Sequence, residues 1–296
     1  MPGAPTGGHM LGALDDRDVI EQVVDIGAHP VARAGPERDA IVARVRRELA
    51  ADGCCVLAGF VRPGLRETLR AEGAAVAPRA HRDVDVVNVY NTDPDPTLPA
   101  GHPARRTMIR GNAFVARDLL GSDALVQHLY TSTALQEFVA ACVGAPRVHV
   151  LADPLAGLTL NVVAPGRGHP WHFDTNEFTI SVVTQEPEAG GVFEYCPGIR
   201  SRGDENLAEV AAVLDGRAEH LVRRATLRAG DLQIFAGRYA LHRVTTVEGA
   251  RERHSAILAY SARPGVVGSP ARTRQLFGRL TPAHGGDPVR VDGLLD

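Results

Sequence analysis

Apolar and polar residues follow a helical spacing through the first half of this chain. Residues 37–52 carry the clearest example, because apolar side chains from Ile41 to Leu49 fall on one stripe while Arg and Glu occupy the other face. Gly53 follows as a stop signal, and the apolar run 54–60 after it predicts a first strand. Further helices are expected at 65–77 and at 124–143, the latter as one helix or two.

From about residue 147 onward the spacing changes to short, strand-length runs separated by turns. Pairs such as Pro165-Gly166 and Pro197-Gly198 mark the turns, and one helical stretch, 205–214, interrupts the series. Many short strands at near-even spacing are typical of a double-stranded β-helix, the jelly roll of cupins. We therefore expect a mainly β fold with α, in which a jelly-roll core follows an N-terminal helical region. The strands are expected at 147–152, 158–164, 171–175, 178–185, 191–196, 221–227, 231–235, 241–247 and 254–262.

These patterns divide the chain into four segments of a single structural domain. Residues 1–16 are expected to form a disordered N-terminal lead, because their start is rich in Gly and Pro. Residues 17–146 form the helical portion that packs on the core, and residues 147–265 form the jelly-roll core. Residues 266–296, rich in Gly, Pro and Arg, are expected as C-terminal loops that fold back over the barrel.

Composition and charge exclude several classes of partner for this chain of 296 residues. A net charge of −3 gives no reason to expect nucleic acid or an anionic membrane surface. No apolar run approaches the roughly 20 residues of a membrane span. The four cysteines form no C-x-x-C pair, so we expect a cytoplasmic protein without a disulfide framework. A homodimer is left open.

Three residues far apart in the sequence predict one metal site. His172 and Asp174 are two positions apart on an expected strand, where side chains at i and i+2 share a face. His242 lies several expected strands later. A His-x-Asp pair alone arises often by chance, but two histidines and one carboxylate together are the ligand set of non-heme Fe(II) oxygenases.

A second constellation follows the distal histidine. Arg253 and Ser255 again share a strand face, and a guanidinium with a neighbouring hydroxyl can clamp a carboxylate. The alternative is an ordinary ion pair of Arg253 with Glu252 or Glu248.

With these residues in place, the stretch 158–265 resembles the Fe(II)/2-oxoglutarate-dependent dioxygenases. The resemblance implies Fe(II) bound by His172, Asp174 and His242, 2-oxoglutarate as co-substrate, and O2. It also implies that Arg253 and Ser255 hold 2-oxoglutarate, assisted by Asn161. The motifs that carry it are His172-Phe173-Asp174, Gly190-Gly191-Val192-Phe193-Glu194-Tyr195, Gly230-Asp231-Leu232, Gly237-Arg238-Tyr239, His242-Arg243-Val244 and Arg253-His254-Ser255.

The run from Trp171 to Phe178 is similar to a narrower bacterial branch, in which hydroxylases and halogenases modify free amino acids. Halogenases of that branch replace the metal aspartate with a small residue, whereas this chain keeps Asp174. The resemblance therefore implies hydroxylation of an unactivated C–H bond in a small polar substrate, with release of succinate and CO2. The substrate is expected to be a free amino acid or a derivative. Residues weighed as substrate or pocket contacts are His169, Trp171, Glu177, Glu194 and Arg200, with Arg243 as a structural ion pair.

Two other outcomes stay open at this point. The same iron chemistry could give desaturation or cyclisation in a natural-product pathway, because the outcome depends on how the substrate is placed. A metal-binding cupin without redox chemistry, serving as an isomerase or a small-molecule binding module, is the alternative from another class. Arg253 and Ser255 argue against it, since a plain cupin has no need of a dicarboxylate clamp.

Overall fold

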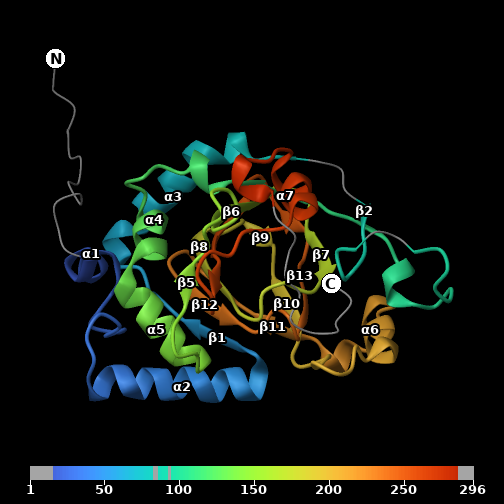
Figure 1. The fold of residues 1–296 in the computed structure, drawn as a ribbon, viewed down its shortest axis with the longest axis horizontal. Helices are drawn as coiled ribbons and strands as arrows, with labels where there is room; N and C mark the ends of the chain where they lie inside the picture. Colours follow the sequence, from blue (N-terminus) through green and yellow to red (C-terminus); the bar gives the residue numbers. More distant parts are fainter. Residues whose placement is uncertain (1–15, 83–85, 93–94, 286–296) are drawn as a thin grey trace.

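The computed structural model describes residues 16–82, 86–92 and 95–285. Its centre is a pair of antiparallel sheets, and helices lie outside them (Figure 1). Side chains of both sheets, such as Phe235 and Phe193, meet in one apolar cluster between them. The expected jelly roll is confirmed. The lead expected at 1–16 lies outside the described residues, except for Asp16. Within the described ranges, no helix combines the length and the apolar character needed to cross a membrane.

The strands form one large sheet, one smaller sheet and three short pairs. The six-stranded sheet has the order β1-β12-β8-β15-β6-β4, with β1 (Cys54–Leu57), β4 (Asn112–Val115), β6 (Leu158–Val163), β8 (Thr179–Gln185), β12 (Leu232–Phe235) and β15 (Arg253–Leu258). The four-stranded sheet has the order β11-β10-β13-β7, with β7 (His169–His172), β10 (Phe193–Cys196), β11 (Arg223–Ala225) and β13 (Leu241–Val244). The short pairs join β2 (Val86–Val87) to β3 (Met108–Ile109), β5 (His149–Val150) to β16 (Tyr260–Ser261), and β9 (Ala189–Gly190) to β14 (Val247–Glu248).

Alternation along the strands gives the large sheet an apolar outer face and an inner face that also carries polar residues. On β15, Ala256 and Leu258 belong to the apolar core beneath the helices. Arg253 and Ser255 alternate with them and therefore face the interior of the barrel. Ser255 lies directly opposite Asn161 on β6, so these polar residues share that inner face.

The N-terminal helices cover the outer, apolar face of the large sheet, at the left and bottom of Figure 1. They are α1 (Asp16–Val23), α2 (Pro36–Asp52), α3 (Arg66–Val76), α4 (Leu125–Thr131) and α5 (Thr133–Val143). The stretch expected as one helix or two is two, because the Ser132 side chain accepts a hydrogen bond from the Leu135 backbone N–H and begins α5 anew. Gly53 and Gly144 end α2 and α5 in the left-handed conformation that favours glycine.

A second apolar cluster covers the outer face of the small sheet. Trp171 of β7 and Leu241 of β13 pack there against Val210 of α6 (Leu207–Leu214), the helical stretch that interrupts the strand series. Tyr90 completes this cluster from the 88–92 loop. The two sheets thus each have helices or loops on their outer faces.

The structure differs from the sequence analysis most clearly at three elements. The helical portion also supplies β4, which pairs with β6 at the edge of the large sheet. The strand expected at 171–175 ends at His172, because the next two backbone N–H groups bond to loops instead of to the ladder. The C-terminal segment expected as loops contains α7 (Pro270–Phe277), which begins at the cap Ser269 and ends at Gly278.

Candidate metal centre

His172, Asp174 and His242 come together at one point inside the barrel. One ligand atom from each lies within 4.8 Å of the other two. Asp174 Oδ1 is 3.7 Å from His172 Nε2 and 3.5 Å from His242 Nε2. The two imidazole centroids are 4.1 Å apart. The predicted ligand set is thus assembled as a cluster that can hold one metal ion.

Backbone carbonyls fix the orientation of both imidazoles. His172 Nδ1 lies 2.8 Å from the Pro170 carbonyl oxygen, and His242 Nδ1 lies 2.9 Å from that of Ala240. A carbonyl can only accept, so Nδ1 of each ring carries the proton and Nε2 keeps its lone pair toward the cluster. Such outer hydrogen bonds set the tautomer and orientation of metal-binding histidines.

The electrostatics of the cluster favour the ligand forms of these side chains. Burial, together with the neighbouring His242, lowers the pKa of His172 to about 3, so its imidazole is neutral at neutral pH. Burial opposes ionisation of Asp174, yet the two histidines and Thr179 hold the pKa of its carboxyl well below the usual range. Neutral imidazoles and a carboxylate are the protonation states that metal binding requires.

Asp174 lies just beyond β7 and is held by its surroundings. Its backbone N–H donates to the Gly237 carbonyl oxygen at 3.1 Å, and Thr179 Oγ1 donates to Oδ2 at 2.5 Å. A Cβ atom on Gly237 would lie 2.0 Å from Oδ2, so only glycine leaves space for the carboxylate. The sequence analysis found Asp174 and counted Gly237 in a motif without connecting it to Asp174, and it missed Thr179.

Arg253 lies in the barrel interior with Ser255 beside it. Its guanidinium donates to Ser255 Oγ at 3.2 Å, and the residue is 5% exposed. Burial lowers the pKa of Arg253 to about 10, so it stays charged at neutral pH. Glu252, weighed as its partner, instead pairs with Arg82 and His254. Across the described part of the chain, no carboxylate pairs with Arg253, and the site fits an anionic ligand.

Asn161 occupies the predicted place next to this clamp. It lies opposite Ser255 in the ladder, is buried, and its Oδ1 accepts a hydrogen bond of 2.9 Å from Asn112 Nδ2 on β4. A Cβ atom on Gly191 would lie 3.1 Å from Arg253 Cδ, so the Gly190-Gly191 turn packs closely against the Arg253 side chain. These positions bring the three residues assigned to 2-oxoglutarate to one inner face.

His169 forms part of the wall beside the metal cluster. β7 carries one extra residue against β13, since Val244 opposes His169 while His242 opposes His172. This bulge re-aims the strand, and His169 stacks on His172 with centroids 3.8 Å apart. Phe114 meets His169 edge-on at 6.4 Å.

Two arginines missed in the sequence analysis lie near this wall. Arg110 is 5% exposed, and its guanidinium carbon is 5.9 Å from the Phe114 ring centre. Its Nη2 atom donates a hydrogen bond to the Gln275 carbonyl of α7. Burial is the main cause that holds the pKa of His169 well below its usual value, and the charges of Arg110 and Arg272 also lower this pKa. Arg110 precedes β4 and Arg272 lies in α7, so only the fold brings them together.

The remaining candidates lie elsewhere. Trp171 packs in the outer cluster and under the guanidinium of Arg243, 4.6 Å from its ring centre, which favours packing over substrate contact. Arg243 forms an ion pair with Glu194, in agreement with the structural ion pair expected from the sequence. The side chain of Glu177 is 48% exposed and 3.6 Å from Arg202, so the structure does not bring it to the metal cluster. Glu194 forms an ion pair with Arg224, and Arg200 forms one with Glu205. Both pairs lie outside the barrel interior.

The donor set fits an iron ion with open positions for small ligands. Two imidazole nitrogens and one carboxylate oxygen from one side are the facial triad of non-heme Fe(II) oxygenases. The charged clamp of Arg253 supplies, from the inner face of the other sheet, what the distal carboxylate of 2-oxoglutarate needs. The cofactor and co-substrate expected from the sequence therefore suit the residues present.

Comparison with known proteins shows the family and agrees with the fold. The model of the Halogenase D family, HalD, matches residues 37–269. Among solved structures, the non-heme alpha-ketoglutarate-dependent carbocyclase SnoK from nogalamycin biosynthesis superposes with a TM-score of 0.53, at 17% identity over 88% of this chain and 96% of its own. The epimerase SnoN, in complex with Fe3+, alpha-ketoglutarate and nogalamycin RO, gives a TM-score of 0.52, at 20% identity over 87% and 96%.

A Pseudomonas putida prolyl-4-hydroxylase gives a TM-score of 0.46 at 17% identity, over 73% of this chain and 96% of its own. No curated protein matches this chain. At these identities the solved structures establish the fold alone.

Proposed function

This chain belongs to the Halogenase D family and has the fold and metal triad of an Fe(II)/2-oxoglutarate oxygenase, and from that premise we propose that it hydroxylates a free amino acid or a close derivative. The reaction consumes 2-oxoglutarate and O2 and releases succinate and CO2. Although the family name refers to halogenation, one residue at the metal argues for transfer of oxygen instead.

That residue is Asp174, and it carries the proposal. Its carboxylate lies among the two histidines, receives a hydrogen bond from Thr179, and fills the space that Gly237 leaves. His172, Asp174 and His242 would together hold the iron. With its carboxylate as a ligand, Asp174 would occupy the place that a halide would need.

The chain's own residues supply binding and orientation. Bound Fe(II) and 2-oxoglutarate supply the chemistry, an oxidation by O2 strong enough to remove hydrogen from an unactivated C–H bond. Arg253 and Ser255 hold the distal carboxylate of 2-oxoglutarate through charge-assisted hydrogen bonds. The carbonyls of Pro170 and Ala240 keep the proton on Nδ1 of each ligand histidine.

The substrate class is inferred from the wall of His169 and Phe114 and from the charges of Arg110 and Arg272. The His169 imidazole stacks on a metal ligand and meets Phe114, over which Arg110 lies, and the charges of both arginines act to lower its pKa, so this wall is polar and under the influence of positive charge. A substrate carboxylate suits this wall better than an apolar surface does. A carboxylate anchored there places the carbons of a small substrate beside the metal, and the carbon held closest is hydroxylated.

A screen by mass spectrometry tests the proposal. The purified protein is incubated with Fe(II), ascorbate, 2-oxoglutarate and each amino acid in turn, in buffers with and without chloride. We expect a gain of one oxygen atom in one or a few amino acids, coupled to succinate, with the His242→Ala variant as the inactive control. Chlorinated product from the unmodified protein would overturn the role given to Asp174.

Loss of two hydrogens instead of a gain of oxygen would assign the chain to desaturation or cyclisation. Turnover of large apolar or carrier-bound substrates alone would reject the amino acid class and leave the iron chemistry intact. Tight metal binding without any consumption of 2-oxoglutarate would favour a non-redox cupin.

A further inference from the structure

The metal ligand Asp174 is positioned by two loops, whereas both histidines belong to β-strands. The backbone N–H of Phe173 donates to the Val89 carbonyl at 2.9 Å, and that of Asp174 donates to the Gly237 carbonyl at 3.1 Å. The Phe173 carbonyl accepts from Asn91 Nδ2 at 3.1 Å. Whatever holds these loops in place therefore also sets the position of the carboxylate.

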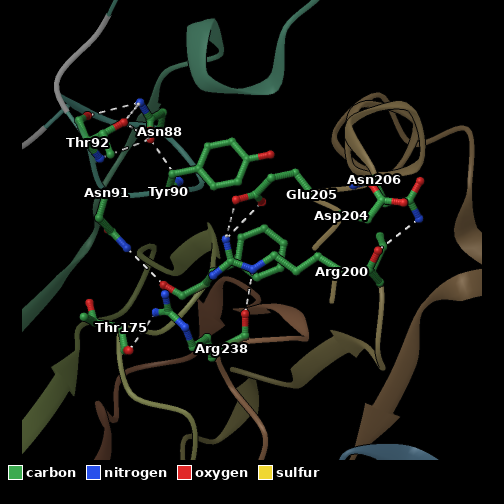
Figure 2. Close-up of polar contacts among 12 residues, drawn as sticks. Asn88, Tyr90, Asn91, Thr92, Thr175, Arg200, Asp204, Glu205, Asn206 and Arg238 are labelled. Atoms are coloured by element: carbon green, nitrogen blue, oxygen red, sulfur yellow. Dashed lines mark hydrogen bonds and ion pairs between the residues drawn. The ribbon is translucent and has the colours of Figure 1, made fainter. Parts of the chain in front are cut away.

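Arg200 contacts both the segment that carries Asp174 and the turn that faces it. Its guanidinium carbon lies 3.8 Å from the centre of the Phe173 ring. Its Nε donates to the Arg238 carbonyl at 2.6 Å, within the Gly237-Arg238-Tyr239 turn. Arg238 in turn donates from Nη1 to the Thr175 carbonyl at 2.8 Å, beyond Asp174 (Figure 2). The two supports of Asp174 are thus connected through one side chain.

The environment of Arg200 holds this side chain in a single place. Its side chain is fully buried, and Nη1 donates to Glu205 Oε2 at 3.1 Å. Tyr90 stacks against Phe173 with centroids 5.7 Å apart, and the Arg200 guanidinium carbon lies 5.9 Å from the centre of the Tyr90 ring, so the guanidinium lies beside both rings. Figure 2 shows the Arg200 side chain with its bonds to Glu205 and to Arg238.

The chemistry of the side chain explains why an arginine occupies this place. A guanidinium is flat, so it can stack on a ring and still donate within its plane to a carbonyl and a carboxylate. A lysine ammonium is a point charge and cannot stack on Phe173 while it bonds to both Arg238 and Glu205. Exchanging Arg200 for lysine therefore keeps the charge and removes the geometry.

We propose that Arg200 is a positioning residue that holds the Phe173-Asp174 segment against the 237–239 turn and so fixes the Asp174 carboxylate at the metal. The inference rests on the proposed function only in assuming a metal on this triad. Arg200 touches neither metal nor substrate, and its effect passes through the backbone on both sides of Asp174. Glu205 is its charge partner, and Asn91 supports the same segment through its hydrogen bond to the Phe173 carbonyl.

The test compares Arg200→Lys with Arg243→Lys in the full chain. Arg243 is a matched control, because it also stacks on an aromatic ring, that of Trp171, and pairs with a buried glutamate, Glu194. It adjoins His242, a ligand held by strand pairing on both sides. Co(II) serves as the probe, with its dissociation constant and its visible d–d absorption measured without substrate or O2.

We expect Arg200→Lys to weaken Co(II) binding by about 10–100-fold, the range for groups that orient metal ligands, and to change the shape of the Co(II) spectrum. Arg243→Lys should stay within about threefold of the unmodified protein and keep its spectrum. Equal affinity and identical spectra for Arg200→Lys and the unmodified protein would overturn the inference, as would equal losses in both variants.

If Arg200→Lys does not fold, as judged by circular dichroism, the double variant Arg200→Gln/Glu205→Gln takes its place, because it removes both buried charges together. The same expected and overturning results apply to it. Failure of the unmodified protein to bind Co(II) at all would instead count against the proposed metal function, so the two failures can be distinguished.

Discussion

His242 on β13 lies directly opposite His172 on β7, and the two imidazoles are 4.1 Å apart between centroids. Strand pairing therefore brings together two residues that are distant in sequence. His242 also pairs with Tyr195 of β10 on its other side, so it lies inside the small sheet. Both histidines have rigid backbone positions, and this rigidity makes the effect of removing either one predictable.

Replacing His172 or His242 with alanine should abolish tight Fe(II) binding. Each change removes one of three protein ligands, so the loss should exceed the about 10–100-fold that outer hydrogen-bond partners contribute. Equilibrium dialysis against Fe(II) under anaerobic conditions measures it. His220→Ala, at an exposed position, is the control and should bind like the unmodified protein. Full affinity in both ligand variants would eliminate the triad.

Replacing Arg253 with leucine should raise the KM for 2-oxoglutarate by about 30-fold or more, because truncating one partner of a buried charge pair costs about 2–5 kcal/mol. Succinate release at varied 2-oxoglutarate concentration measures this. Arg251→Leu, two residues earlier and exposed, should leave the KM unchanged. A reversed pattern would move the clamp to Arg251.

Lowering the pH should destabilise the metal-free protein through His172. The pKa of this imidazole is about 3 in the fold and 6.5 ordinarily, so the unfolded chain binds more protons between these values. The contribution is complete above pH 6.5 and is lost as the pH falls toward 3. One proton corresponds to about 1.4 kcal/mol per pH unit.

Urea unfolding of the metal-free protein between pH 7 and pH 5 measures this dependence. His172→Asn should reduce the slope of the unfolding free energy against pH by up to about 1.4 kcal/mol per pH unit. His220→Asn should leave this slope unchanged. An unchanged slope in His172→Asn would show that the buried imidazole is not the group responsible.

Replacing Arg110 with leucine should weaken substrate binding more than iron binding. Arg110 lies near His169 through Phe114 and contacts none of the three metal ligands in the described ranges. We expect the KM for the hydroxylated amino acid to rise at least tenfold while the Fe(II) affinity stays within about threefold. Arg117→Leu is the control, since it also has a guanidinium over a ring, that of Tyr130. A parallel loss of Fe(II) affinity would indicate that Arg110 supports the metal cluster instead.

The elements whose apolar pattern is regular were predictable from the sequence. α2, α3 and the strands of the large sheet after residue 147 lie where alternation or helical spacing placed them, because one face of each packs on a single core. β4 was missed because its four residues, Asn112–Val115, show no alternation of polar and apolar residues in the sequence. α7 was missed because its cap Ser269 and its end Gly278 lie in a stretch rich in turn-forming residues.

The metal ligands were predictable because their chemistry is rare and their spacing is characteristic. The expectation that His172 and Asp174 share one strand was wrong, since β7 ends at His172 and the loops place Asp174. The roles of Thr179, Gly237, Arg110 and Arg272 depend on contacts between distant segments. The β7 bulge that aims His169 inward is a property of strand pairing, which a single sequence does not specify.

Gly237 makes two positions of this chain dependent on each other. Any larger residue there would collide with the Asp174 carboxylate, so Gly237→Ala should be tolerated far better when residue 174 is also small. A lineage that exchanged the aspartate could afterwards accept side chains at 237, and each such change would make return to the carboxylate harder. The steric conflict between a methyl group at position 237 and the carboxylate at position 174 would then make the exchange of this metal ligand difficult to reverse.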